Sequence, residues 1–141
     1  MQKILANIGT VLAVVLLILG LVAMLRSNQS KNTTTKTSSS QTSQLQTIQN
    51  DLKNGAVLLD VRTPEEYNAR HAKDATLWPL QDIQAGKLPS SDKSQKYYVY
   101  CRSGNRSAQA KEILEQTGYK NIIDLGGTTA LDRIGLPMAG N

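Results

Sequence analysis

The chain has 141 residues, a net charge of +5 and a single cysteine. This length allows one folded domain, and one cysteine excludes an internal disulfide framework. Four of the 16 basic residues and none of the 11 acidic ones precede Leu45, which leaves 12 basic against 11 acidic residues in the rest of the chain. A nucleic-acid-binding domain carries a basic surface on its folded part. We therefore expect no nucleic-acid partner.

The N-terminal segment is almost continuously apolar. Residues 4–25 would form a helix of roughly 33 Å, which is enough to cross a hydrocarbon core of about 30 Å. A secretory signal peptide is the alternative, but its apolar region is about 7–15 residues long and ends in a small-residue cleavage site. This segment is longer and offers no good site. We predict an uncleaved transmembrane anchor over residues 1–26, which contacts the lipid bilayer through residues 4–25.

The segment over residues 27–43 is rich in Ser, Thr, Gln and Asn and has no apolar pattern. Such a composition predicts a disordered linker. The basic residues on the two sides of the anchor slightly favour a cytoplasmic C-terminus, whereas Ser/Thr-rich stalks are common on exported domains. We expect a cell-membrane protein with a single-pass N-terminal anchor and an extracytoplasmic catalytic domain over residues 44–141.

Helical and extended patterns alternate from the start of this domain. Apolar residues at helical spacing predict an amphipathic helix over residues 45–52. The apolar run AVLLDV, residues 56–61, predicts a buried strand. TPEE, residues 63–66, is typical of a helix start, with Thr as N-cap, Pro at the first position and Glu at the third. This helix should run to about residue 70.

The same alternation continues to the end of the domain. YYVY, residues 97–100, predicts a second strand, residues 107–117 an amphipathic helix, and NIIDL, residues 121–125, a third strand. Strands that alternate with helices imply parallel pairing and an α/β fold, with a central parallel sheet flanked by helices. Functional sites of such sheets lie beyond the carboxyl ends of the strands, and Cys101 follows the second strand.

Cys101 begins a short polar loop, CRSGNRS, before the predicted helix. The helix N-terminus offers a positive partial charge and free N–H groups, and Gly104 lets successive N–H groups point inward as an anion nest. Arg102 and Arg106 add positive charge. All of these favour the thiolate over the thiol, whose ordinary pKa is near 8.5. A buried core cysteine is the alternative, but it does not require two arginines and a helix start beside it.

Three segments, in the right order, resemble the rhodanese family: LLDVRTPEEY at residues 58–67, YCRSGNRSAQAKEIL at 100–114 and DLGGTTALDRIGLP at 124–137. The resemblance implies a rhodanese-like fold and a thiosulfate sulfurtransferase-like enzyme with Cys101 as the catalytic nucleophile. It implies that thiosulfate or another small sulfane donor loads a persulfide on Cys101, and that a thiol or cyanide acceptor unloads it.

By this resemblance, the substrate-binding residues are those that follow the nucleophile. They are Arg102, Ser103, Gly104, Asn105, Arg106 and Ser107. Asp60, Arg62, Glu66 and His71 are expected to have structural roles near the site, through an Asp60–Arg62 or an Arg62–Glu66 pair. His71 is not needed as a base, because N–H groups already stabilise the thiolate. No carboxylate cluster or second His accompanies His71, so we expect no metal and no cofactor.

Other functions remain open. Cysteine phosphatases have five residues between Cys and Arg, whereas four separate Cys101 from Arg106. This tighter loop suits a persulfide better than a tetrahedral oxyanion, which makes phosphatase or arsenate reductase activity a minor alternative. A membrane-tethered binding, sulfur-carrier or redox-sensing module with little turnover is the main alternative. We expect a monomer.

Overall fold

The structure is a computed structural model that describes residues 33–90 and 92–140. The predicted anchor over residues 1–26 and the start of the predicted linker lie outside these residues. None of the helices within the described ranges is both long and apolar enough to span a bilayer. The chain divides into two units, residues 1–40 and 41–141, and the second contains the sheet and the site.

Helix α2 (Thr33–Lys53) differs from the predicted linker. Residues 33–43, which their composition assigned to a disordered segment, are helical and continuous with the predicted helix over residues 45–52. Helix nucleation is costly, but each residue added to an existing helix costs little. The amphipathic turns around Ile48, which is buried, therefore extend toward the N-terminus through the polar segment.

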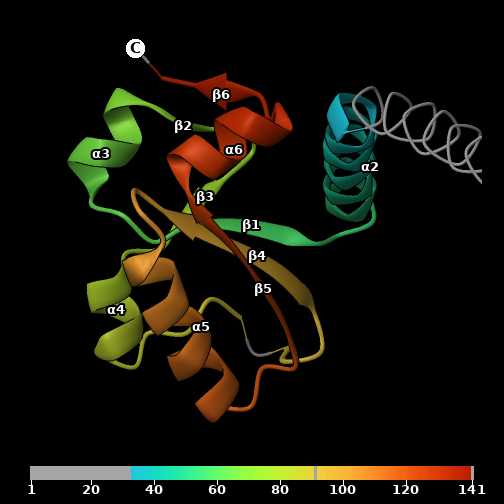
Figure 1. Cartoon of the computed structure of the whole chain (residues 1–141). Coiled ribbons are helices and arrows are strands. Elements are labelled where there is room, and N and C mark those ends of the chain that lie inside the picture. Colours follow the sequence, from blue (N-terminus) through green and yellow to red (C-terminus); the bar gives the residue numbers. More distant parts are fainter. Residues whose placement is uncertain (1–32, 91, 141) are drawn as a thin grey trace, which may run out of the picture. The chain divides into compact units, whose positions relative to one another are not determined.

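A four-stranded sheet forms the centre of the second unit (Figure 1). Its strands are β1 (Val57–Asp60), β3 (Thr76–Leu77), β4 (Lys96–Cys101) and β5 (Asn121–Gly127). They lie in the order β3-β1-β4-β5, and every pairing is parallel, as predicted. The carboxyl ends of all four strands therefore lie at one edge of the sheet, where β4 ends at Cys101.

Helices cover both faces of the sheet. The bounds of three of them are α4 (Leu80–Gln84), α5 (Asn105–Gln116) and α6 (Thr128–Ile134). Figure 1 shows α4 and α5 on one side and α6 on the other. Side chains alternate along β4, so Val99 and Cys101 join the core with α4 and α5, whereas Tyr98 and Tyr100 join the opposite core. Burial on both faces explains the continuous apolar run of this strand.

Helix α3 (Pro64–Ala69) confirms the predicted helix start and ends one residue before the predicted end. The Thr63 side chain accepts from the N–H of Glu66, and the Glu66 carboxylate accepts from the N–H of Thr63. This reciprocal arrangement is a capping box. Two short strands, β2 (His71–Ala72) and β6 (Met138–Ala139), pair antiparallel. The sequence did not predict them, because two residues carry no periodicity.

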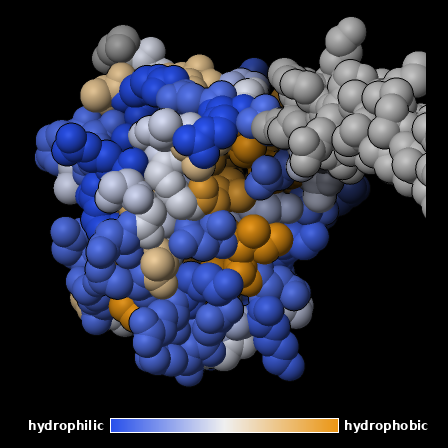
Figure 2. All heavy atoms as spheres, viewed as in Figure 1, coloured by the Kyte–Doolittle hydropathy of each residue, from blue (hydrophilic) through white to orange (hydrophobic). Residues whose placement is uncertain are grey.

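Polar side chains cover most of the molecular face in Figure 2. Among the described residues, Ile123 is the large hydrophobic residue that is clearly exposed, at 38%. A single exposed apolar side chain of this kind is normal on a protein surface and does not indicate a docking surface. Apolar residues are instead buried in the two cores beside the sheet.

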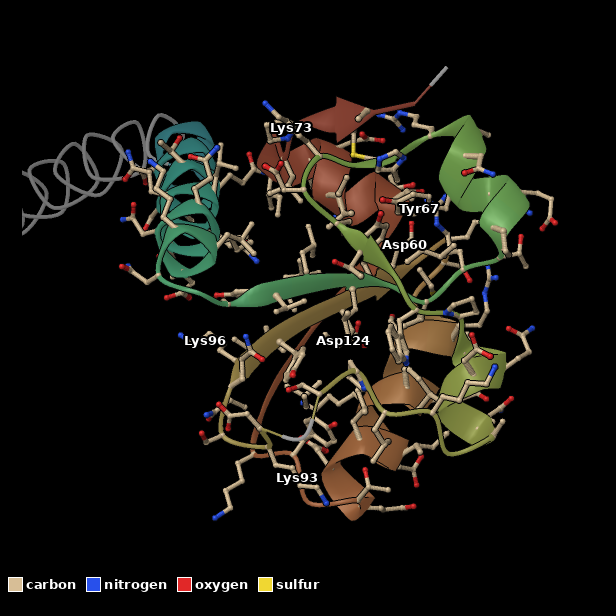
Figure 3. All side chains as sticks on the ribbon, turned by 180° about the vertical axis from the view of Figure 1, so that it is seen from behind. Asp60, Tyr67, Lys73, Lys93, Lys96 and Asp124 are labelled. Carbon is tan, nitrogen blue, oxygen red and sulfur yellow. The ribbon has the colours of Figure 1, made fainter. Side chains whose placement is uncertain are left out.

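A buried ion pair fixes the end of β1. Oδ2 of Asp60 accepts from Nη2 of Arg62 at 2.5 Å and from the Tyr100 hydroxyl at 2.6 Å. Burial and the Asp60 carboxylate raise the pKa of Tyr100, which keeps its hydroxyl protonated as a donor. Figure 3 shows Asp60 on the same side of the sheet as Tyr67. The predicted Asp60–Arg62 pair is confirmed, whereas the alternative pair with Glu66 is wrong because Glu66 binds another arginine.

Arg62→Ala is expected to lower the free energy of unfolding by about 3–5 kcal/mol, because it leaves Asp60 as an uncompensated buried charge. Arg70→Ala is the matched control. Its side chain and that of its partner Asp132 are 53% and 45% exposed, and exposed ion pairs contribute about 0–1 kcal/mol. Urea unfolding followed by Trp78 fluorescence measures both variants. Equal losses would contradict the importance of burial.

Candidate active site

Cys101 is the last residue of β4, at the carboxyl end of the sheet, where the sequence placed it. Its side chain is fully buried. The chain turns through residues 102–104 and enters α5 at Asn105, two residues before the predicted start. Gly104 is the N-cap residue with φ 97°, a left-handed conformation that favours glycine.

Hydrogen-bond donors gather around the sulfur of Cys101. The N–H of Gly104 donates to Sγ at 3.0 Å, and Oγ of Ser107 lies 3.7 Å from Sγ. Burial by itself raises the pKa of the Cys101 thiol. Hydrogen bonds from the backbone and hydroxyl of Ser107 and from the N–H groups of Gly104 and Ser103 outweigh this effect, so the pKa is lowered. The predicted nest of N–H groups and the direction of the pKa shift are thus confirmed.

The end of β5 packs against the same loop. Gly127 pairs with Cys101 in the sheet and forms a bridge with Ser103. A Cβ on Gly127 would lie 2.7 Å from the carbonyl oxygen of Arg102 and 3.0 Å from the Cα of Ser103. The first distance is too short for real side chains, so a glycine is required here. The sequence reasoning missed this residue, although two consecutive glycines at a strand end are a signal of close backbone approach.

The two loop arginines act on the thiol less than predicted. Arg106 forms an ion pair with Glu66, with Nη1–Oε2 at 2.6 Å and Nη2–Oε1 at 2.8 Å. This hydrogen bonding is the main reason that the pKa of Arg106 is raised, and the charge of Cys101 contributes less. Arg102 is exposed. The main causes that lower the pKa of Cys101 are hydrogen bonds with nearby N–H groups and one hydroxyl.

Other residues that the sequence assigned to the site form contacts away from the sulfur of Cys101. The Asn105 side chain accepts a hydrogen bond from Gln109 on the exposed surface of α5. Asp60 binds Tyr100, whose side chain lies on the face of the sheet opposite Cys101. His71 stacks on Tyr67 with ring centroids 3.9 Å apart, and its Nδ1 lies 2.8 Å from the Tyr67 carbonyl oxygen. These contacts are structural.

No three His, Cys, Asp or Glu side chains gather into a potential metal site within residues 33–90 and 92–140. The reactive group that the loop presents is the Cys101 thiol. A thiol with a lowered pKa, beside N–H donors at the start of a helix, favours the thiolate, which is the form that acts as a nucleophile. The donors can also stabilise negative charge on an atom bonded to that sulfur.

A family model for the rhodanese-like domain matches residues 42–131. The chain belongs to this family. It is 40% identical over 72 residues to thiosulfate sulfurtransferase PspE of Escherichia coli K12, a match that covers 49% of this chain and 67% of that protein. It is 39% identical over 85 residues to a sulfurtransferase of Allochromatium vinosum, which covers 58% of this chain and 77% of that protein.

A solved structure supports the same assignment at the level of the fold. The structure titled "rhodanese with anions from E. coli" is 36% identical and superimposes with a TM-score of 0.51. The match covers 62% of this rhodanese-like chain and all of that chain. The predicted α/β rhodanese-like fold, with a parallel sheet flanked by helices, is therefore confirmed for the domain.

Ser107→Ala is expected to raise the pKa of Cys101 and so to lower its thiolate fraction, because the Ser107 hydroxyl is one of the groups that lower this pKa and a hydrogen bond to a charged group contributes about 1.5–3 kcal/mol. A pH titration followed by the ultraviolet absorbance of the thiolate measures this change. Ser103→Ala is the control, since Ser103 is exposed and keeps its backbone N–H. The same shift in both variants would contradict a specific role for the Ser107 hydroxyl.

Proposed function

We propose that this protein is a sulfurtransferase that carries sulfane sulfur as a persulfide on Cys101. The observation that carries the proposal is the surroundings of Sγ: the N–H of Gly104 donates to it at 3.0 Å, and Oγ of Ser107 lies 3.7 Å away. These contacts favour the thiolate form of Cys101, which must attack the sulfur donor. The outer sulfur of a persulfide lies about 2 Å beyond Sγ.

Each half of the reaction is a displacement at sulfur. In the loading step, the Cys101 thiolate attacks the sulfane sulfur of a donor, the S–S bond of the donor breaks, and its electron pair leaves on sulfite when the donor is thiosulfate. In the unloading step, a thiolate or cyanide attacks the outer sulfur of the persulfide. The bond between the two sulfurs breaks, and Cys101 regains its thiolate.

The direct test is the mass of the full-length protein after incubation with thiosulfate. Cys101 is expected to gain the mass of one sulfur atom, and thiocyanate is expected to form when cyanide follows. Cys101→Ser should abolish both results. The double variant Cys101→Ser, Lys87→Cys is the matched control, because Lys87 is 68% exposed and a thiol there lacks the surrounding N–H groups. It should not restore turnover.

Other outcomes separate the competing functions. A thiol that stays unmodified with every sulfane donor would favour a binding module and contradict the transferase. Faster oxidation of Cys101 by peroxide than loading by thiosulfate would favour a redox sensor. Hydrolysis of an aryl phosphate would favour a phosphatase, which the Arg106–Glu66 pair argues against because that arginine is already bound to a carboxylate.

We further propose that residues 4–25 anchor the protein in the cell membrane and that the domain lies on the extracytoplasmic side. The length of the apolar segment supports the anchor. The Cys101→Ser, Lys87→Cys variant has one exposed thiol, so a membrane-impermeant maleimide should label it in intact cells. Labelling that requires permeabilised cells would place the domain in the cytoplasm and contradict this orientation.

A further inference from the structure

The ion pair between Arg106 and Glu66 neutralises one of the two positive charges of the loop. Both side chains are 27% exposed, so water screens the pair only in part. Two parallel hydrogen bonds, at 2.6 and 2.8 Å, give it the bidentate geometry that is strongest for an arginine and a carboxylate. The hydrogen bond from Arg106 is the main cause that lowers the pKa of Glu66 to about 2, so the carboxylate is charged throughout the neutral range.

The Glu66 carboxylate is held in place before any substrate arrives. Its Oε2 atom also accepts from the N–H of Thr63 at 3.2 Å, within the capping box of α3. The next residue, Tyr67, donates its hydroxyl to the carbonyl of Ala75 at 2.7 Å, which fixes the helix on the domain. The acid beside the loop is therefore a preorganised partner of Arg106 rather than a freely moving surface side chain.

Arg102 is the remaining cation of the loop. It is exposed, and no ion pair involves it among the residues that the structure describes. A loop with one available guanidinium compensates one negative charge well and two charges poorly. Thiosulfate carries two negative charges, whereas the persulfide of a thiol carries one or none on its sulfur atoms.

We infer that Glu66 is a specificity-determining residue that holds Arg106 away from the substrate and makes the loop select persulfides of thiols, R–S–SH, over dianionic donors. This inference rests on the proposed sulfur transfer. The Cys101 thiolate attacks the outer sulfur of R–S–SH, the S–S bond of the donor breaks, and its electron pair leaves on R–S⁻. Cys101 keeps the transferred sulfur with its proton as a persulfide.

Glu66→Gln tests the inference because it removes the charge and keeps the capping box, in which Gln can replace Glu. The full-length protein is labelled with nitrogen-15 and titrated with sodium sulfate at constant ionic strength, and the amide signals of Gly104 and Ser107 report binding. We expect sulfate to bind about five-fold more tightly to the variant than to the native protein, because a neighbouring negative charge is gone and Arg106 is released.

Two matched variants distinguish the release of Arg106 from the loss of a nearby negative charge and from the loss of the ion pair. Glu65→Gln removes the same charge from the adjacent residue, whose carboxylate hydrogen-bonds with Thr63 whereas Arg106 pairs with Glu66. This variant should leave the affinity for sulfate nearly unchanged. Arg106→Gln breaks the pair without releasing a cation and should not tighten binding. Equal sulfate affinity in Glu66→Gln and the native protein, or equal tightening in all three variants, would overturn the inference.

Sulfate binding does not depend on sulfur transfer, so the two proposals can fail separately. If Cys101 never gains sulfur but Glu66→Gln still tightens sulfate binding, the proposed function fails and the role of Glu66 in anion selection stands. In an active protein, Glu66→Gln should raise kcat/KM for thiosulfate relative to an alkyl persulfide by a similar factor. An unchanged ratio would overturn the preference for persulfides.

Discussion

The close approach of β5 to the loop after β4 is the constraint on which the site depends. Gly127 lies opposite Cys101 in the sheet, and any side chain on it would meet the carbonyl oxygen of Arg102. An irregularity in the pairing between Val99 and Tyr100 brings these two backbones into register. With the loop seated in this way, the N–H of Gly104 faces Sγ instead of water. The chemistry of Cys101 thus rests on a contact between two backbones.

Short-range hydrogen bonds and full charges have separate roles in this domain. The pKa of Cys101 is lowered against the effect of burial by N–H groups and a hydroxyl that lie close to the sulfur. The full charges neutralise one another in pairs: Asp60 with Arg62 in the interior, and Glu66 with Arg106 beside the loop. Paired charges stabilise and orient the surrounding elements, while the unpaired dipoles of the backbone remain available to the reacting atom.

Elements with a clear hydrophobic pattern or a capping sequence were predictable. β1, β4, β5 and α3 lie where the sequence placed them, since the apolar runs of the strands and the capping sequence of α3 are signals carried by neighbouring residues. α4 and α6, with five and seven residues, are too short to show helical periodicity. Helix α5 begins before its predicted start because Gly104 takes a left-handed conformation and serves as the N-cap.

The sequence by itself determined that Cys101 ends a buried strand and precedes a helix start, because those features depend on adjacent residues. It therefore also determined the nest of N–H groups and the direction of the pKa shift. Only the tertiary structure decided the partner of Arg106, since Glu66 lies 40 residues away in the chain. It likewise decided that Gly127 supports the loop, because parallel pairing of β4 with β5 brings these distant backbones into contact.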